Sequence, residues 1–231
     1  MGATLLDAVS LLARLDPEVL AIVWLSFQVS LGATALGSLV GLPLGAWIAV
    51  TEFPGRAAVT VLLNGLMGTP PVVLGVIVYL ALSRSGPLGT LGLLYSPTAM
   101  VIAQTLLVTP LIAALARQTV EDAWRDYRVE LTALGFGRRL AVLTLLRDCR
   151  YSLVVAVLAG LGRAMSEVGA VMIVGGNIDG FTRVMTTAIA LETAKGDLPL
   201  SIALGLVLIS VVMALNALAF GLRQWAMRRY G

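Results

Sequence analysis

Two oppositely charged residues, Arg163 and Glu167, lie near the middle of an apolar run from Tyr151 to Val174. This run is long enough to cross a bilayer, because a membrane helix needs only about 20 apolar residues. A charge at the centre of such a helix costs on the order of 3 kcal/mol. The two residues are four apart, so they share a helix face, and at ~4 Å they attract by about 4 kcal/mol for an effective dielectric of roughly 20. The pair can therefore offset its own burial, and it predicts a protein-lined interior.

The chemistry open to this pair is interaction with a charged species. In one interpretation, Arg163 offers positive charge to a passing anion while Glu167 prevents tight binding. In the other, the two residues brace the helix against its neighbours and touch no ligand. Small residues on nearly the same face favour contact with protein over lipid: Ala156, Gly160 and Ala170. We favour a bracing or gating role.

Two further segments follow the charged run and could belong to the same site. Gly175-Gly176-Asn177 combines flexible backbone with an amide, which suits a mouth that opens but suits a simple loop equally well. The segment 185–193 is apolar yet too short to span, and it predicts a re-entrant or interfacial helix. Its hydroxyls at Thr186 and Thr187 can coordinate an anion without fixed charge.

The composition places the chain in a membrane. Of its 231 residues 58% are hydrophobic and 13% are charged, with a mean hydropathy of +0.94, whereas soluble domains are about 45–50% apolar and about 25% charged. Long apolar runs favour helices over a barrel, whose strands alternate. The chain has no His and a single cysteine, Cys149, so it lacks the commonest metal ligand and general base. We expect an all-α polytopic protein with no metal, no cofactor and no catalytic residue.

Five apolar runs predict about five transmembrane helices, at 20–50, 57–82, 97–115, 151–174 and 198–222. Seven Arg follow the third run and three follow the fifth, whereas the opposite boundaries carry only four basic residues. Because cytoplasmic loops hold the excess of positive charge, we predict that the N-terminus lies outside and the C-terminus inside.

This orientation divides the chain into a transmembrane domain at 20–222, with a cytoplasmic loop at 117–150, and a cytoplasmic tail at 223–231. The N-terminal segment 1–19 is predicted to lie at the membrane interface as a short amphipathic helix, although a plain loop fits nearly as well. The residues that suggest the helix are Leu5, Leu6, Val9, Leu12 and Leu15.

Local signals predict where helices pack, begin and break. Proline is expected to interrupt the second run at Gly68-Thr69-Pro70-Pro71 and the third at Thr109-Pro110. Ser96-Pro97 predicts an N-cap followed by a proline in the first helical turn. Three glycines spaced four apart in the first run predict close helix packing: Gly37, Gly41 and Gly45.

The loop from Glu121 to Arg150 is charged but patterned. Apolar residues recur at helical intervals as far as Leu134, and Gly135 is expected to end that helix. A second short helix is predicted to begin near Arg138. The apolar faces of these two helices need a partner, either the bilayer surface or a groove in another protein. Their basic residues could also contact anionic lipid.

Part of this loop, Val129-Glu130-Leu131-Thr132-Ala133-Leu134-Gly135, resembles the EAA–G loop of ABC importer permeases. In that family the short helix docks into a cleft of the ATP-binding subunit. Val129 stands where the family usually has Glu, and the Leu-Pro that normally follows is absent. The resemblance implies an ATPase coupling loop that contains Glu130, Thr132, Ala133, Leu134, Gly135, Phe136, Arg138 and Arg139.

A longer stretch from Gly162 to Ile178, GRAMSEVGAVMIVGGNI, resembles the fourth-span signature of oxyanion importer permeases and within that group is closest to the tungstate type. The following TRVMTTAIALET, from Thr182 to Thr193, strengthens the tungstate assignment over molybdate or sulfate. The resemblance extends over roughly 24–222. It implies that a translocation path or gate contains Arg163, Ser166, Glu167, Gly175, Gly176, Asn177, Thr186 and Thr187.

The family implies a type I ABC importer fold in a prokaryotic inner membrane. Its members work as a permease homodimer with two ATP-binding subunits and an extracytoplasmic anion-binding protein. The chain agrees on one point, because it has no G-x-x-x-x-G-K-[ST] motif and must rely on a separate ATPase. We expect inward transport of tungstate or a similar tetrahedral oxyanion, with the lipid bilayer and no nucleic acid as a further partner.

Three alternatives remain open from the sequence. The anion could be molybdate or another oxyanion. The chain could be a stand-alone secondary transporter or channel that uses Arg163 and Glu167 as a proton relay, although five spans without an inverted repeat weaken this view. An intramembrane enzyme would have no His and no second central cluster of charges to work with.

Overall fold

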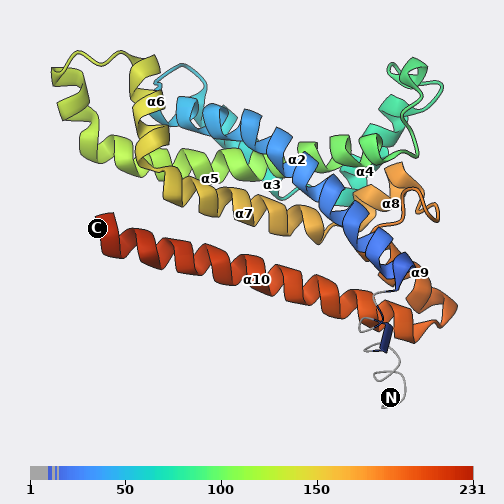
Figure 1. Ribbon diagram of the computed structural model, residues 1–231. Helices are drawn as coiled ribbons and strands as arrows, with labels where there is room; N and C mark the ends of the chain where they lie inside the picture. The colour runs from blue at the N-terminus through green and yellow to red at the C-terminus, as the bar shows by residue number, and fades with distance from the viewer. Residues whose placement is uncertain (1–9, 12–13, 15, 231) are drawn as a thin grey trace. The chain divides into compact units, whose positions relative to one another are not determined.

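The computed structural model describes residues 10–11, 14 and 16–230, and within them all regular secondary structure is helical (Figure 1). Three helices are long and apolar enough to cross a membrane: α2 (Pro17–Val50), α5 (Pro97–Ala133) and α10 (Leu198–Tyr230). The shorter elements are α3 (Arg56–Met67), α4 (Pro71–Leu82), the 3-10 turn η1 (Gly89–Leu91), α6 (Arg138–Asp148), α7 (Arg150–Met165), α8 (Gly169–Gly175) and α9 (Met185–Lys195). The predicted all-α polytopic fold is confirmed. The helix predicted within 1–19 falls largely outside the described residues.

Two of the five predicted spans are bent helix pairs. Helices α3 and α4 meet at 97°, and α7 and α8 meet at 59°, so the described residues contain up to five candidate spans if each pair counts as one. The break between α3 and α4 was predicted, because Pro70 and Pro71 cannot donate the hydrogen bonds that continue a helix. The fourth run was expected to be one helix, and that prediction is wrong. It breaks at Ser166–Val168, where no proline lies.

Helix α5 is longer than the apolar run that predicted it. The sequence suggested a span that ends near Leu115 and a separate short helix in the loop, but α5 continues without interruption to Ala133. The predicted interruption at Thr109-Pro110 is wrong, because Pro110 lies inside this helix and does not end it. The start agrees with the prediction, because the backbone N–H of Ala99 donates to the Ser96 hydroxyl (3.3 Å) and Pro97 is the first helical residue.

The chain divides into two compact units. Unit 1 comprises Met1–Ala33, Pro70–Gln104 and Gly162–Ala214, and unit 2 comprises Thr34–Thr69, Thr105–Leu161 and Leu215–Gly231. Helices α2, α5, α7 and α10 contribute residues to both units. Helices α4, α8 and α9 lie entirely in unit 1, and α3 and α6 entirely in unit 2.

Within unit 2, the glycine repeat of α2 packs directly on α5, as predicted. A Cβ atom added at Gly37 would lie 2.7 Å from Val108 Cγ2, and one at Gly41 would lie 3.0 Å from the Thr109 carbonyl oxygen. At Gly45 the added atom would lie 2.8 Å from the backbone nitrogen of Arg117. Only glycine allows the two backbones to approach this closely.

A methyl group at Gly45 is therefore expected to destabilise the chain. Gly45→Ala forces α2 away from the α5 backbone, which cannot yield as a side chain can, and overpacking of this kind costs about 1–3 kcal/mol. The matched control is Gly65→Ala on α3, where nothing lies within 4 Å of an added Cβ and alanine favours the helix by about 1 kcal/mol. Thermal unfolding in detergent should show a lower Tm for the first variant only. Equal Tm values would mean that the α2–α5 contact is not tight.

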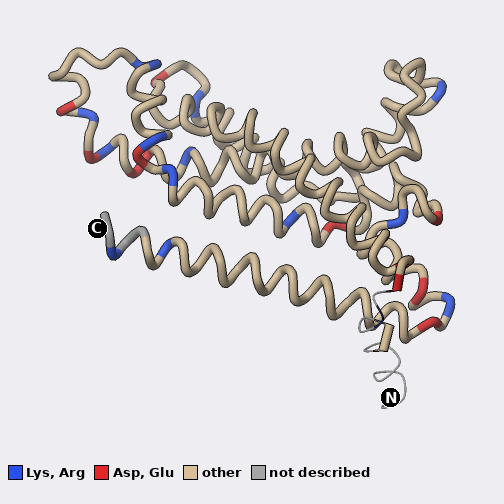
Figure 2. The backbone as a smooth tube through the Cα atoms, viewed as in Figure 1, with Lys and Arg blue, Asp and Glu red and all other residues tan. Residues whose placement is uncertain are grey.

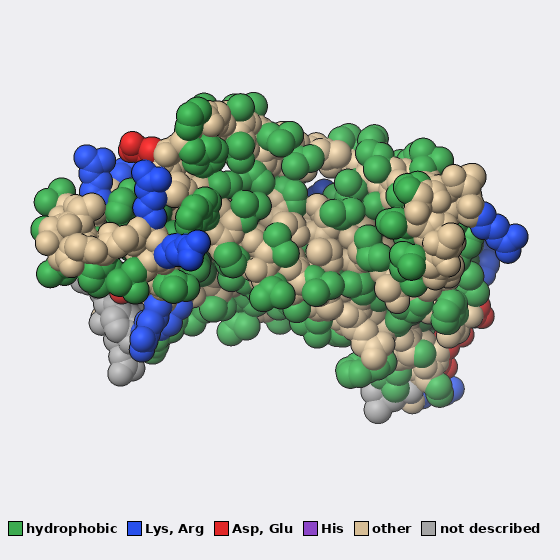
Figure 3. Space-filling model, turned by 90° about the horizontal axis from the view of Figure 1, so that it is seen from above, with side chains coloured by type: hydrophobic (Ala, Val, Ile, Leu, Met, Phe, Trp, Pro, Cys, Tyr) green, Lys and Arg blue, Asp and Glu red, His purple; other side chains and the backbone are tan. Residues whose placement is uncertain are grey.

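Large hydrophobic side chains are exposed on both units, and hydrophobic side chains cover much of the face seen in Figure 3. Examples are Trp24 on α2, Leu62 on α3 and Ile209 on α10, which are 61–65% exposed. Such a surface is unusual for a soluble protein. It is the surface expected of helices whose outer faces contact lipid.

Candidate functional site

Glu167 lies in the break between α7 and α8 and organises the start of α8. Its carboxylate accepts a hydrogen bond from the backbone N–H of Ala170 (3.2 Å), which satisfies one of the unpaired donors at a helix start. Its backbone carbonyl accepts a hydrogen bond from the hydroxyl of Thr186 on α9 (2.6 Å). Glu167 is only 6% exposed. This one residue therefore links the end of α7, the start of α8 and α9 within unit 1.

Glu167 also lines a small cavity of about 10 Å³, which is roughly the space that one water molecule needs. The other polar residues that line it come from α2, α5 and α9: Ser26, Ser30, Gln104 and Thr186. The amide nitrogen of Gln104 donates to the carbonyl of Ala164 (3.0 Å). Its buried amide oxygen meets no hydrogen-bond donor in the part of the chain that the structure describes. The cavity thus brings polar side chains from four segments of unit 1 together.

Arg163 and Glu167 do not form the ion pair that their spacing predicted. Because α7 ends at Met165, the two residues do not lie on one continuous helix, and the expected common face is lost. Arg163 is exposed whereas Glu167 is buried, and no ion pair joins them among the described residues. Ser166, which lies between them, is exposed and donates its hydroxyl to the Gly162 carbonyl (2.9 Å). The two charges therefore have separate surroundings.

The predicted mouth at Gly175-Gly176-Asn177 is an internally bonded turn. Gly176 and Asn177 adopt left-handed backbone conformations with φ of 71° and 49°. The buried Thr182 hydroxyl donates to the Gly175 carbonyl (2.6 Å), and the Asn177 amide donates to the Thr187 carbonyl (3.3 Å). These bonds connect the end of α8 to α9 within unit 1.

The short helix predicted after this turn is α9. The Thr187 hydroxyl donates to the Val184 carbonyl (3.1 Å) and accepts from the Val184 N–H (3.2 Å), which caps the helix start. Both Thr186 and Thr187 are buried. Their hydroxyl protons are engaged inside the protein, so in this conformation the two residues position α9.

Sequence reasoning missed three residues of this site, namely Ser26, Ser30 and Gln104. The Ser26 hydroxyl accepts a hydrogen bond from the Met185 N–H (2.8 Å) and so connects α2 with the start of α9. Each is a polar residue within a largely apolar helix. A polar side chain at that depth is itself a functional signal, and it could have pointed to all three.

A cluster of charges, also missed, connects three segments of unit 1. The Arg183 guanidinium pairs with Asp179 (3.2 Å), Glu18 (3.6 Å) and the buried Glu192 (3.8 Å). Lys195 also pairs with Glu192 (2.9 Å). The start of α2, the α8–α9 connection and α9 are therefore joined by charge as well as by hydrogen bonds.

In unit 2, the end of α5 presents the segment that the sequence assigned to ATPase coupling. Gly135 has φ of 76°, its N–H donates to the Thr132 carbonyl (3.0 Å), and the Phe136 N–H donates to the Leu131 carbonyl (2.9 Å). This is the Schellman arrangement, and it confirms that Gly135 ends the helix. Leu134 is 72% exposed. The other predicted residues of the loop are exposed as well, apart from the half-buried Phe136: Glu130, Thr132, Ala133, Gly135, Arg138 and Arg139.

The predicted second short helix is α6, and it anchors this exposed segment to unit 2. Ala141, Val142 and Leu145 are buried against the C-terminal end of α2 and the middle of α5. Leu140 and Leu143 point outward and are 49% and 64% exposed. The α5–α6 region thus offers apolar side chains on a rigid support.

Charged residues of unit 2 gather over α6 and the adjoining half of α5 (Figure 2). At their centre, Glu121 pairs with Arg117, Arg56 (3.2 Å) and Arg125 (3.6 Å). Arg56 also donates to the last carbonyls of α2, at Ile48 (2.9 Å) and Ala49 (3.1 Å). The network fixes α5 to the end of α2 and the start of α3.

No family model matches the chain, but several curated proteins are similar to it along most of its length. It is 42% identical to the tungstate uptake system permease protein TupB of Peptoclostridium acidaminophilum, over 94% of this chain and 95% of that protein. It is 41% identical to a probable anion ABC transporter permease protein of Haloferax volcanii, over 92% and 94% of the two chains. The molybdenum transport system permease protein ModB of Escherichia coli is 28% identical over 92% of this chain.

Proposed function

Because the chain belongs to the family of anion ABC transporter permeases, we propose that it carries tungstate, or a similar tetrahedral oxyanion, into the cell. The observation that carries this proposal is the 42% identity to a tungstate permease along nearly the whole of both chains. The more distant similarity to a molybdenum permease, at 28% identity, supports the wider oxyanion class and makes molybdate the second candidate.

Membership of this family confirms the expected class of protein and its expected location. The chain is a transport subunit and not an enzyme, and it is a multi-pass protein of the prokaryotic inner membrane. The alternative interpretation, a stand-alone secondary transporter or channel, is therefore set aside in favour of a subunit of an ABC importer. The expected partners are a second permease copy, two ATP-binding subunits and an extracytoplasmic anion-binding protein. The expected orientation keeps the basic α5–α6 region in the cytoplasm.

The α5–α6 region is proposed to receive the ATPase. Leu134, Leu140 and Leu143 offer exposed apolar side chains, and the Schellman turn at Gly135 holds the first of them in a fixed position. Exposed apolar side chains on a rigid support are suited to binding in a groove of a partner protein. The Glu121 network would then pass movement of the ATPase to α2 and α3 of unit 2.

Arg163 and Glu167 are proposed to have different tasks. Arg163 is exposed beside the break and would offer a transient positive charge to the passing dianion. Glu167 is buried, holds the start of α8 and accepts the Thr186 hydroxyl, so it would set the geometry of the gate. The turn at Gly175-Gly176-Asn177 would move with α8.

The substrate can be tested with the binding protein and ATPase that accompany this permease. Calorimetry of tungstate, molybdate and sulfate on the binding protein should rank tungstate first, and tungstate-loaded binding protein should stimulate ATPase activity of the reconstituted complex most strongly. Equal affinity and equal stimulation by sulfate would overturn the substrate assignment. Failure of the permease to retain any ATPase would overturn the proposed docking role of the α5–α6 region.

A further inference from the structure

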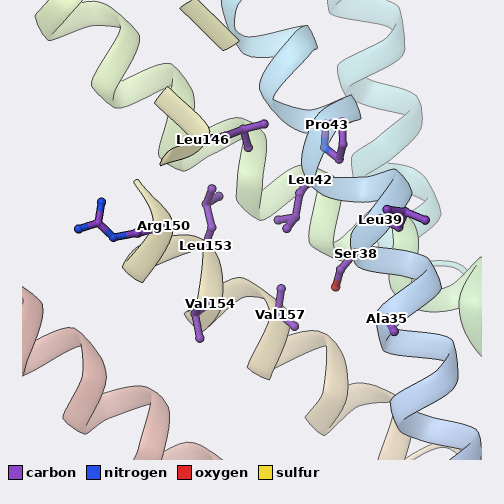
Figure 4. A pocket seen from close by; sticks show the side chains of 10 residues that line it. All are labelled: Ala35, Ser38, Leu39, Leu42, Pro43, Leu146, Arg150, Leu153, Val154 and Val157. Carbon is purple, nitrogen blue, oxygen red and sulfur yellow. The ribbon is translucent and has the colours of Figure 1, made fainter. Parts of the chain in front are cut away.

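An open groove of about 480 Å³ runs between α2 and α7 within unit 2. Figure 4 shows Leu42 and Ser38 of α2 and Leu153 and Val157 of α7 lining it. Nearly all of its lining is apolar, and Leu39 at its edge is 74% exposed. Neither the proposed gate at Arg163 and Glu167 nor the proposed contact with the ATPase involves this groove.

One end of the groove is positively charged. Arg150, the first residue of α7, lines that end and directs its guanidinium away from the apolar side chains (Figure 4). The guanidinium donates to the Arg147 carbonyl (3.0 Å) and to the Tyr151 hydroxyl (3.3 Å), which holds it at this end. A ligand with an anionic end and a long apolar remainder would therefore match both parts of the groove.

Aromatic residues beside the charged end favour a position for it at the level of the lipid headgroups. Tyr151 and Trp225 pack edge to face with ring centroids 5.1 Å apart, and the Arg150 guanidinium lies 4.5 Å from the Tyr151 ring centre. Tyr and Trp gather at the membrane–water interface. From Arg150 to Val157 the groove extends about 10 Å along α7, while one leaflet has roughly 15 Å of hydrocarbon.

We propose that this groove binds an anionic phospholipid, with an acyl chain along α2 and α7 and the phosphate at Arg150. The apolar lining, the positive charge at one end and the length of the groove all match such a lipid. A second copy of the chain matches less well, because an interface between copies does not require a cation at one end of an apolar groove. The inference depends on the membrane location of the chain and not on which anion it transports.

Binding of phosphatidylglycerol and phosphatidylcholine to the purified full chain, measured by native mass spectrometry, tests the proposal. Phosphatidylglycerol should bind the wild type more tightly. Arg150→Gln should weaken its binding about fivefold, because one basic residue near the surface contributes about 1 kcal/mol, and should leave phosphatidylcholine unchanged. Arg228→Gln is the matched control, since it removes the same charge from an exposed residue that does not line the groove.

A second pair of variants tests the apolar part. Ala35→Trp fills the groove and should reduce binding of both lipids, whereas Val40→Trp, at an exposed α2 residue outside the groove, should not. Unchanged thermal unfolding would establish that each variant is folded. Equal phosphatidylglycerol binding by the Arg150 and Arg228 variants would overturn the proposal. So would a disulfide between two copies that carry Leu39→Cys and Val154→Cys, because the groove would then be an interface between permeases.

Discussion

Replacing Leu134 with Asp is expected to abolish ATP-driven uptake and leave the permease folded. Leu134 is 72% exposed and follows the last residue of α5, so the new carboxylate meets solvent and not the core. In a docked complex the same carboxylate would be buried in an apolar groove. Loss of such a contact typically costs about 2–4 kcal/mol, which is roughly 30- to 1,000-fold in affinity.

Co-purification of the ATPase with the tagged permease measures this effect, and thermal unfolding of the permease alone checks its fold. Leu134→Met is the matched control, because it keeps an apolar side chain of similar length at the same position and should retain the ATPase. If the Asp variant bound the ATPase as the wild type does, the coupling surface would have to lie elsewhere.

Replacing Glu167 with Ala is expected to lower stability and abolish uptake together. The change leaves the Ala170 N–H without its acceptor, and an unsatisfied buried donor costs about 1–3 kcal/mol. In a chain of this length each kcal/mol lowers Tm by roughly 2–4 °C. Uptake should fail because the break between α7 and α8 loses the bond that sets its geometry.

Two further variants separate charge from geometry at this break. Glu167→Gln keeps an oxygen that can accept the Ala170 N–H, so its Tm should remain near that of the wild type. Arg163→Ala removes an exposed side chain and should abolish uptake with no loss of Tm and with the complex still assembled. Normal uptake in Arg163→Ala would remove Arg163 from the path. A large fall in its Tm would show that Arg163 braces the fold and does not serve the passing anion.

Features that depend on neighbouring residues were predictable. Ser96 and Pro97 set the start of α5, Gly135 sets its end, and the four-residue spacing of the glycines at 37–45 places them on one face of α2, although the helix that packs there was not predicted. Each follows from backbone geometry or from hydrogen bonds within a few residues. The apolar runs located the spans for the same reason, since hydropathy is a property of short segments.

Features that depend on contacts between distant segments were not predictable. The bend between α7 and α8 involves Glu167 and Thr186, which are 19 residues apart. The continuation of α5 past Leu115 was missed for a different and local reason, because the helix was predicted to end where the sequence stops being apolar. Ion pairs of Glu121 with Arg117 and Arg125, four residues away on either side, support the helix there.

Tungstate uptake into proteoliposomes is the most direct test of the central claim, that this permease imports an oxyanion by means of a separate ATPase. The vesicles would contain the permease, with or without its ATPase subunits, and the loaded binding protein would be added outside. Uptake should require ATP, the ATPase subunits and the binding protein, and it should cease when any one is left out. Flux through the permease alone, without ATP, would contradict the account.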